Sequence, residues 1–207
     1  MRDAAQPIYL ADYQPPAFLV DRVALTFRLA PTATRVLSRV RFVPNPAAVP
    51  GQSLRLDGEG LRLISALIDD TPVDVTPDAT GLTIDASTLP DGPFTWEAEV
   101  EIAPEGNTAL EGLYMSNGMY CTQCEAEGFR KITYYPDRPD VMAPFRVRIE
   151  SDLPVLLSNG NPAGAGHGWA EWDDPHPKPS YLFALVAGDL VATEGRFTTM
   201  DGRDVAL

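Results

Sequence analysis

Histidine and cysteine are scarce in this sequence, with two of each among 207 residues. A tetrahedral zinc site needs four ligands, and the C-x-x-C pair formed by Cys121 and Cys124 supplies only half of them. The two histidines, His167 and His176, are too far apart in the sequence to match the spacing of common zinc motifs. We therefore expect this chain to bind no metal of its own.

Basic residues are also few. The 16 Lys and Arg residues stand against 29 Asp and Glu residues, which gives a formal net charge of −13 at neutral pH. Nucleic acids and anionic membranes both bind to basic surfaces, so neither is an expected partner. An acidic surface favours cationic ligands, including molecules with a free amine, although it also serves simple solubility.

Long apolar runs are missing as well. The longest, Tyr181–Ala187, is far shorter than the ~20 residues that cross a bilayer as a helix. The first 18 residues carry charges at Arg2, Asp3 and Asp12 and contain no continuous apolar core, so we expect no signal peptide. The expectation is a cytoplasmic protein in which both cysteines are reduced.

What the sequence does contain is a repeating two-residue pattern. With 20 Pro and 16 Gly there is little room for a long helix. The segment Phe94–Ile102 alternates apolar residues with Thr and Glu, and Val23–Leu29 alternates in the same way, as half-buried strands do. We predict an all-β fold, an antiparallel β-sandwich that forms one domain over residues 1–207. Weaker strands are expected at 34–43, 61–68, 73–75, 81–84, 145–149 and 181–186.

Two further expectations concern the last forty residues. Trp169 and Trp172 are interpreted as core residues in front of a rigid proline-rich crossing at 173–179, with an aromatic sugar-binding patch as the alternative. Residues 196–200 and 203–207 flank Asp201-Gly202 and predict a hairpin, with the type I′ turn that Asp-Gly favours. Because the chain stops inside the second strand of that hairpin, we expect it to be part of a longer protein.

The densest polar segment, 111–130, contains both cysteines. A thioredoxin-like redox site would need a β-α-β setting with a helix beginning at the first cysteine. The surrounding pattern is all-β, so we interpret Cys121 and Cys124 as two reduced structural thiols.

The same segment holds the carboxylates of Glu111, Glu125 and Glu127. Gln123 and Glu125 are two positions apart, so in an extended segment both side chains point to the same side. A carboxylate beside an amide oxygen suits a primary ammonium group, which offers three donors and no acceptor. The alternative is a solvated acidic loop without a ligand.

Several blocks of this sequence resemble bacterial aminopeptidase N, a family of zinc metallopeptidases. The most specific is C-T-Q-C-E-A-E-G-F-R at 121–130. The likeness extends over essentially the whole chain, in the same order. The other blocks that carry it are 9–27, 54–68, 107–114, 132–135, 137–141, 156–161 and 178–189.

The resemblance implies a saddle-shaped β-sandwich that caps a downstream, thermolysin-like catalytic domain. It implies that Glu125 anchors the α-ammonium group of a peptide substrate with a free N-terminus, and that Gln123 lines the pocket for the first side chain. The family's zinc-binding H-E-x-x-H and its G-x-M-E-N motif do not occur in these 207 residues. Zinc is thus expected in the full-length enzyme, and no catalytic residue is expected here.

Two other functions remain open from the sequence. One is a stand-alone β-sandwich module that binds peptide or carbohydrate. The other is a redox protein built on Cys121 and Cys124. The truncated hairpin and the specific block at 121–130 favour the aminopeptidase domain over both.

Overall fold

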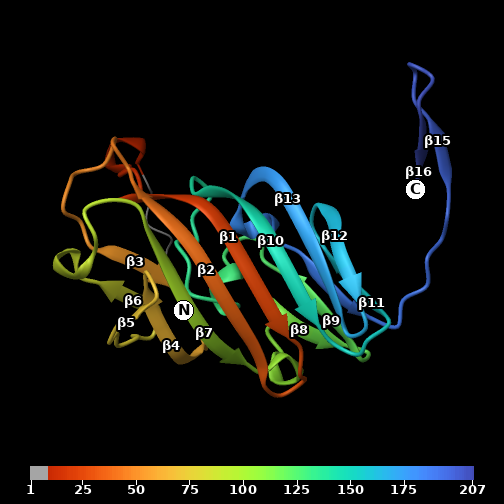
Figure 1. Cartoon of the computed structure of the whole chain (residues 1–207), viewed down its shortest axis with the longest axis horizontal. Coiled ribbons are helices and arrows are strands. Elements are labelled where there is room, and N and C mark those ends of the chain that lie inside the picture. The colour runs from red at the N-terminus through yellow and green to blue at the C-terminus, as the bar shows by residue number, and fades with distance from the viewer. Residues whose placement is uncertain (1–8) are drawn as a thin grey trace.

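Strands dominate the fold. The computed structural model describes residues 9–207, and over that range it contains strands and single-turn 3-10 helices, with no α-helix. The main sheet has eight strands in the spatial order β12-β13-β10-β1-β2-β7-β4-β5 (Figure 1). In that order, the strands are β12 (Asn161–Gly166), β13 (Trp169–Pro179), β10 (Met142–Glu150), β1 (Phe18–Arg28), β2 (Thr34–Pro44), β7 (Phe94–Ile102), β4 (Arg62–Ile68) and β5 (Thr71–Pro72).

Two smaller sheets cover the inner face of the main sheet and complete the sandwich. One has four strands in the order β11-β14-β9-β8, namely β11 (Val155–Ser158), β14 (Leu185–Gly188), β9 (Met119–Gln123) and β8 (Gly112–Ser116). The other pairs β3 (Leu54–Asp57) with β6 (Gly81–Ile84). The single-turn helices lie in the connections, at Leu10–Asp12, Ala86–Thr88, Pro104–Gly106, Phe129–Lys131 and Ser180–Leu182.

The sequence pattern of β7 shows why the sandwich forms. All of its apolar positions are buried and its Thr and Glu positions are only partly so, which gives a strict alternation along the strand. Trp96 at its centre is fully buried. Burying a side chain of that size contributes on the order of 2–3 kcal/mol by the hydrophobic effect. The predicted all-β sandwich is therefore confirmed.

Aromatic side chains fill the space between the main sheet and the four-stranded sheet. The ring of Phe129 lies 5.2 Å from that of Tyr135 and 5.3 Å from that of Phe183, both edge-to-face. Phe145 from β10 and Phe27 from β1 join the same cluster. Edge-to-face contacts of this kind add ~1 kcal/mol each beyond burial. Phe129 therefore anchors the segment that carries the candidate site.

The expectation of a purely antiparallel fold is wrong at one place. β1 pairs with β10 in parallel, with Val23 opposite Phe145. A parallel pair cannot be joined by a tight hairpin, and here the connection runs through β2 to β9 before the chain returns. The other strand pairs in the described residues are antiparallel.

Three local expectations also need correction. The segment expected to be a strand at 181–186 begins as a single-turn helix, and β14 starts only at Leu185. Residues 73–75 form no strand. The proline-rich crossing is instead the second half of β13, where the register against β10 shifts between Ala143 and Phe145. That irregularity accommodates Pro175 and Pro177, which have no N–H group to donate.

The two tryptophans lie in β13 and neither is fully buried. Trp172 packs against the core, and its Nε1 donates a hydrogen bond to Leu156 O at 3.0 Å. Trp169 lies under the guanidinium of Arg148, 4.3 Å from the ring centroid. The core interpretation therefore holds in part for Trp172, while Trp169 belongs to the outer surface.

The predicted hairpin near the C-terminal end is present as β15 (Arg196–Thr198) and β16 (Asp204–Ala206), which extend away from the sandwich (Figure 1). Its turn differs from the expected type I′, which requires a positive φ at both central residues. Gly202 has a φ of 86°, and Asp201 is not in that region. Gly202 N donates to Thr199 O, so Met200 and Asp201 form an ordinary turn that Gly202 closes.

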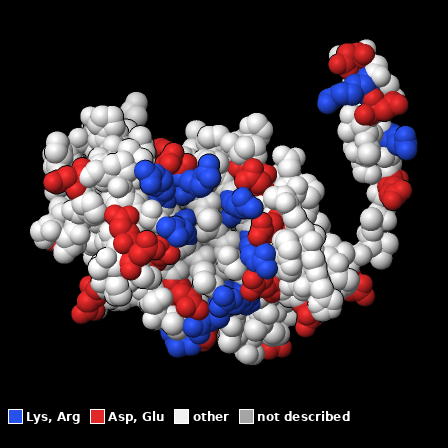
Figure 2. All heavy atoms as spheres, in the orientation of Figure 1, with Lys and Arg blue, Asp and Glu red and all other residues white. Residues whose placement is uncertain are grey.

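The outer face of the main sheet is covered with charged side chains (Figure 2). Arg35 of β2 pairs with Glu99 and Glu101 of β7 at 3.0 and 3.1 Å. Arg148 of β10 pairs with Glu171 of β13 at 3.0 Å. These cross-strand ion pairs are solvated and each contributes little to stability. They identify this face as one that is in contact with water.

Candidate functional site

Gln123 and Glu125 lie where the four-stranded sheet ends. β9 stops at Gln123, and Glu125 opens the turn that follows. Both side chains are exposed, and Cys124 between them is buried. The prediction assumed an extended segment, and Glu125 lies in the turn beyond the end of β9. Gln123 Nε2 donates to the backbone oxygen of Glu125 at 3.3 Å, which links the two residues.

A close backbone approach shapes the turn that carries Glu125. Gly128 N donates to Cys124 O at 2.9 Å and closes the turn. A Cβ atom on Gly128 would lie 2.3 Å from Gln123 O, too close for any other residue. On the neighbouring strand, Gly112 has a φ of 73°, which also favours glycine. The turn therefore requires both residues of the G-F pair at 128–129. Gly128 is needed because the backbone comes too close for a side chain, and Phe129 is needed because its ring packs in the core.

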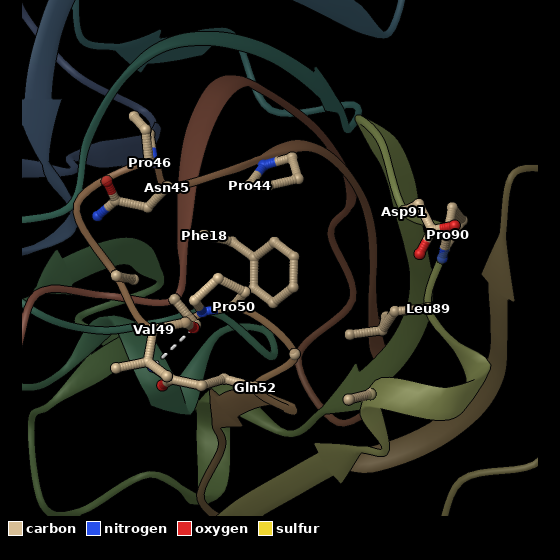
Figure 3. A pocket seen from close by; sticks show the side chains of 14 residues that line it. Phe18, Pro44, Asn45, Pro46, Val49, Pro50, Gln52, Leu89, Pro90 and Asp91 are labelled. Atoms are coloured by element: carbon tan, nitrogen blue, oxygen red, sulfur yellow. Dashed lines mark hydrogen bonds between the residues drawn. The ribbon is translucent and has the colours of Figure 1, made fainter.

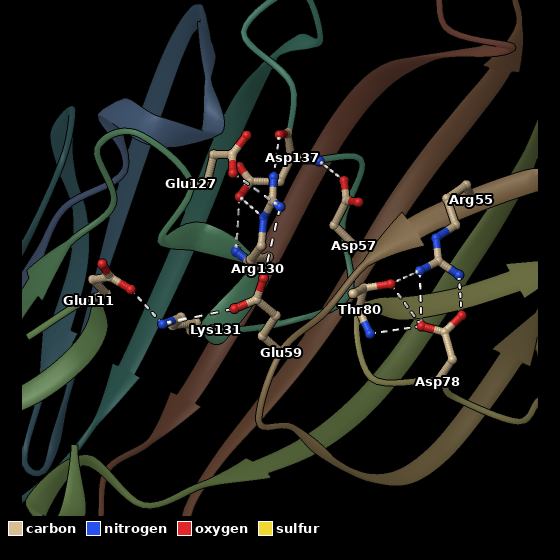
Figure 4. Close-up of polar contacts among 10 residues, drawn as sticks. All are labelled: Arg55, Asp57, Glu59, Asp78, Thr80, Glu111, Glu127, Arg130, Lys131 and Asp137. Atoms are coloured by element: carbon tan, nitrogen blue, oxygen red, sulfur yellow. Dashed lines mark hydrogen bonds and ion pairs between the residues drawn. The ribbon is translucent and has the colours of Figure 1, made fainter. Parts of the chain in front are cut away.

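A largely buried ion pair joins Arg130, which follows this turn, to Asp137 (Figure 4). Arg130 Nε lies 3.0 Å from Asp137 Oδ2, and the Asp137 side chain is only 1% exposed. Ser180 Oγ donates to the other carboxylate oxygen of Asp137. Asp137 N donates to Asp57 Oδ2 at 2.9 Å, which extends the contacts to β3. Asp137 thus joins three separate segments of the chain behind Glu125.

The carboxylates of the segment differ in their partners. Glu127 Oε2 lies 3.3 Å from Arg130 NH1, and Glu111 pairs with Lys131 (Figure 4). Across residues 9–207, the Glu125 carboxylate is in neither an ion pair nor a side-chain hydrogen bond. Of the three carboxylates singled out from the sequence, Glu125 is therefore the one free to bind an external cation.

A shallow cavity of about 340 Å³ lies beside Glu125. Ala126, Pro139 and Tyr181 line it, together with Glu125, Glu127 and Asp137. The combination of apolar walls and an unpaired carboxylate is chemically suited to a ligand with a cationic head and an apolar body.

Residues 40–182 match the peptidase M1 N-terminal domain family, and that match covers more than half of the chain. This chain belongs to the peptidase M1 N-terminal domain family. Its sequence is 50% identical to aminopeptidase N of Caulobacter vibrioides over 99% of this chain, and 46% identical to aminopeptidase N of Escherichia coli over 100% of it. In both cases the chain spans only 24% of the relative's length.

Solved structures agree with this membership. The M1 N-terminal domain described here superposes on Legionella pneumophila aminopeptidase A in complex with aspartic acid with a TM-score of 0.85, at 34% identity. That match covers 95% of this chain and 24% of the Legionella protein. Native yeast LTA4 hydrolase superposes with a TM-score of 0.74 at 18% identity, over 93% of this chain and 32% of the yeast protein, which shows a shared fold.

Both thiols of this M1 N-terminal domain have a raised pKa. Cys121 and Cys124 form no disulfide. Burial raises the pKa of the Cys124 thiol to about 12, and burial also raises the pKa of Cys121. Redox-active thiols have a lowered pKa, because the thiolate is the nucleophile. This environment favours the structural interpretation over the redox one.

The described residues bring together no group of three His, Cys, Asp or Glu side chains that could hold a metal ion. His167 and His176 are both exposed, on β12–β13 and within β13. The helices found in residues 9–207 are single turns, too short to cross a membrane.

A second and larger cavity, of about 440 Å³, opens at the other end of the sandwich (Figure 3). Phe18, Pro50 and Leu89 are among the apolar residues that line it. Its amides are already engaged: Asn45 Nδ2 donates to Pro16 O at 2.7 Å, and Gln52 Nε2 donates to Val49 O at 3.0 Å. Asp91 also lines this cavity, so a carboxylate is present there as well as in the cavity beside Glu125 (Figure 3).

Arg130, Asp137 and Ser180 were not singled out by the residue patterns. Asp137 and Ser180 are separated by more than forty positions, and only the folded sheet brings them together. The one available signal was that the blocks 121–130, 137–141 and 178–189 all carry the family resemblance.

Proposed function

We propose that this chain is the amino-terminal domain of a zinc aminopeptidase that removes N-terminal residues from peptides. In this role it caps the active site of a separate catalytic domain, and Glu125 binds the α-ammonium group of the substrate. The observation that carries the proposal is the unpaired carboxylate of Glu125. It lies in the turn just beyond the end of β9, and the buried ion pair between Arg130 and Asp137 supports that turn. The aminopeptidase relatives support the reaction class.

The chemistry of Glu125 explains a requirement for a free N-terminus. A protonated amine offers positive charge and three donors, and a charge-assisted hydrogen bond contributes on the order of 1.5–3 kcal/mol. An acylated N-terminus offers neither the charge nor those donors. Closure by a second domain would exclude water and strengthen the contact, because opposite charges attract more strongly at lower dielectric.

Gln123 has a separate part in the proposal. Its Nε2 donates one of its two hydrogens to Glu125 O, which leaves Oε1 as a free acceptor beside the second N–H group. A carbonyl oxygen accepts hydrogen bonds and does not repel an ammonium group. We therefore assign Gln123 to the wall of the pocket beside the bound amine, where it lines the space for the first side chain.

Zinc belongs to another part of the longer protein in this proposal. One solved relative is described as an M1 zinc metallopeptidase, from Deinococcus radiodurans. The described residues of this chain do not fit such a site, since both histidines are exposed and the thiols are held protonated. This domain therefore acts by binding and orienting the substrate.

We also propose a cytoplasmic location. Two unlinked cysteines separated by only two residues are typical of a reducing compartment. Cell fractionation with antibody detection tests this, and recovery from the periplasm would contradict it.

The test of function is a charge-neutralising pair of variants in the full-length aminopeptidase. Glu125→Gln should lower kcat/KM for a free amino-acid anilide by roughly 10- to 100-fold, the loss of a charge-assisted contact. The matched control is Glu127→Gln, in the same turn but paired with Arg130. Its effect should stay below about fivefold, because exposed ion pairs contribute less than ~1 kcal/mol.

Two outcomes would contradict the assignment. Equal losses in both variants would mean that the general negative charge of the turn matters, and Glu125 does not bind the amine. Robust hydrolysis of the anilide by the 207-residue chain alone would contradict the division of labour between the two domains.

A further inference from the structure

The cavity lined by Phe18, Pro50 and Leu89 has a fixed aromatic floor (Figure 3). The ring of Phe18 lies 5.4 Å from that of Phe94 and 6.4 Å from that of Phe42 between centroids, both edge-to-face. Phe42 and Phe94 are buried in the core. They hold the Phe18 ring from behind, and its remaining surface faces the cavity. The volume of about 440 Å³ is within the range of small-molecule sites, roughly 300–1,000 Å³.

Proline rings form much of the wall. Four of the residues that line the cavity are prolines, at positions 44, 46, 50 and 90. A proline ring fixes φ and has almost no side-chain freedom to lose when a ligand binds. Because ordering of a site opposes binding, a wall of this kind binds an apolar ligand at a low entropic cost.

Hydrogen bonds fix the two loops between which the cavity lies. After β2, Asn45 N donates to Ala17 O at 3.0 Å, which ties this loop to the start of β1. On the other side, Asp85 Oδ1 accepts from Ser87 N at 2.8 Å and caps the single-turn helix in front of Leu89. The cavity is therefore formed before any ligand arrives.

Asp91 gives this cavity its charge. It is exposed, and it is the one charged residue that lines the cavity in the described part of the chain. Within residues 9–207 its carboxylate is in neither an ion pair nor a side-chain hydrogen bond, unlike Asp85 and Asp78. The formal net charge of −13 adds a general attraction for cations.

We propose that this cavity binds small aromatic amines, with the protonated amine on Asp91 and the aromatic ring against Phe18 and the proline rings. The amine supplies positive charge and donors to a carboxylate that has no partner in the described residues. The aromatic ring replaces water on the Phe18 ring and packs against it. The two cavities share no lining residue, so this site is separate from the one beside Glu125 and does not depend on the proposed function.

The chemistry of the lining also selects against free amino acids. An α-carboxylate next to the amine would lie close to Asp91, and like charges repel. No Lys, Arg or His of the described residues lines the cavity to compensate. Phenethylamine should therefore bind more tightly than phenylalanine, although the two carry the same ring and the same amine.

A photoreactive amine can locate this site in the full-length protein. The probe is para-azidophenethylamine, which loses nitrogen in light and inserts into the residues around its ring. Trypsin cuts after Arg41 and Arg55 and releases the peptide 42–55, which carries one wall of the cavity. That peptide contains no residue of the cavity beside Glu125, so its labelling, measured by mass spectrometry, reports this cavity alone.

Labelling of peptide 42–55 should saturate as the probe concentration rises. An excess of phenethylamine should suppress it, whereas phenethyl alcohol and phenylalanine at the same concentration should suppress it several-fold less. Asp91→Asn should raise the half-saturating probe concentration about threefold to fivefold, the size expected for an exposed charge pair. The matched control is Asp152→Asn, an exposed carboxylate between β10 and β11 that lies outside the cavity, and it should change nothing.

Three results would overturn the proposal. Labelling of peptide 42–55 that does not saturate would mean that the probe reacts there only by chance collision. Equal effects of Asp91→Asn and Asp152→Asn would mean that only net charge matters. Equal suppression by phenethylamine and phenethyl alcohol would mean that the cavity selects an aromatic ring and not an amine.

A cavity-filling variant tests the location independently. Ala48→Trp places a large ring among the lining residues and should abolish saturable labelling. Saturable labelling that persists in Ala48→Trp would place the probe elsewhere on the peptide and overturn the proposal. Hydrolysis is not measured in any of these experiments, so normal activity of Glu125→Gln would contradict the proposed function and leave the amine site standing.

Discussion

Arg130 Nε and Asp137 Oδ2 lie 3.0 Å apart in the interior, behind the turn that carries Glu125. The Arg130 side chain is 16% exposed and that of Asp137 is 1% exposed, so this pair is largely removed from water. Most other ion pairs of the described residues lie on the solvated outer surface. Removing one partner of this pair is therefore expected to cost more stability than removing one partner of an exposed pair.

Asp137→Asn should destabilise the domain by about 3 kcal/mol, near the lower end of the cost of breaking a buried pair. The cost stays near that end because Glu127 remains 3.3 Å from Arg130. Urea unfolding monitored by circular dichroism measures it. The control is Asp140→Asn, which removes a partly exposed pair with Arg138 and should cost less than about 1 kcal/mol. Equal costs would show that burial does not set the strength of the Arg130–Asp137 pair.

Gly128→Ala should destabilise the domain by about 1–3 kcal/mol, the usual cost of forcing an extra methyl group into a packed site. The added Cβ would meet Gln123 O at 2.3 Å, so the turn must move. In the full-length enzyme the same change should raise KM, because Glu125 moves with the turn. Gly106→Ala is the control, since nothing lies within 4 Å of its Cβ position. Unchanged stability in Gly128→Ala would contradict the close approach.

Cys124 should make stability fall in alkaline solution. Burial raises its pKa in the folded chain to about 12, above the value of an unfolded thiol. Between those two pKa values the unfolded chain loses a proton that the folded chain keeps, so unfolding becomes more favourable as pH rises, by up to ~1.4 kcal/mol per pH unit. Below the pKa of the thiol in the unfolded chain, the stabilising contribution of the buried Cys124 thiol is fully present.

The measurement is the free energy of unfolding at pH 8 and pH 10, for the wild type and for Cys124→Ala. Tyrosines also titrate in this range, so the difference between the two proteins isolates the thiol. The wild type should lose more stability than Cys124→Ala over this interval. Parallel pH profiles would show that the Cys124 thiol is accessible to water in the folded state.

Amide hydrogen exchange should be much faster in the β15–β16 hairpin than in β1 and β2. A two-stranded hairpin is marginally stable by itself in water. Phe197 in β15 is 57% exposed and the hairpin extends away from the sandwich. Exchange followed by mass spectrometry measures the difference. Strong protection of residues 196–206 in the 207-residue chain would mean that the hairpin packs on the sandwich in solution.

The sequence predicted best those strands that bury one face along their whole length. β7 was predicted with its observed bounds, because every second side chain is apolar and the others are Thr or Glu. β13 was missed because its prolines at 175, 177 and 179 indicate a break, while a local irregularity against β10 tolerates them. Short strands such as β8 and β11 have no alternation to detect, because both of their faces are uncharged.

At the candidate site, the sequence indicated how the side chains are oriented, but it did not indicate the buried contacts that stabilise the turn. The two-residue spacing of Gln123 and Glu125 predicted that both side chains point to the same side of an extended segment; both are exposed, but Glu125 lies in a turn. The contact of Asp137 with Arg130 and Ser180 depends on how the sheets close, and no local pattern encodes it. That Glu125 alone of the three carboxylates lacks a partner in the described residues also follows only from tertiary structure.

The parallel pairing of β1 with β10 has a kinetic consequence. Val23 finds its neighbour Phe145 only after most of the domain has left the ribosome, since β10 and then β13 complete the main sheet on that side. Until then the growing chain exposes the open edge of β1, which is a template for pairing with other chains. Closing so long a loop is slow. Nascent chains of this domain are thus predicted substrates for chaperones that bind unpaired β-strands during translation.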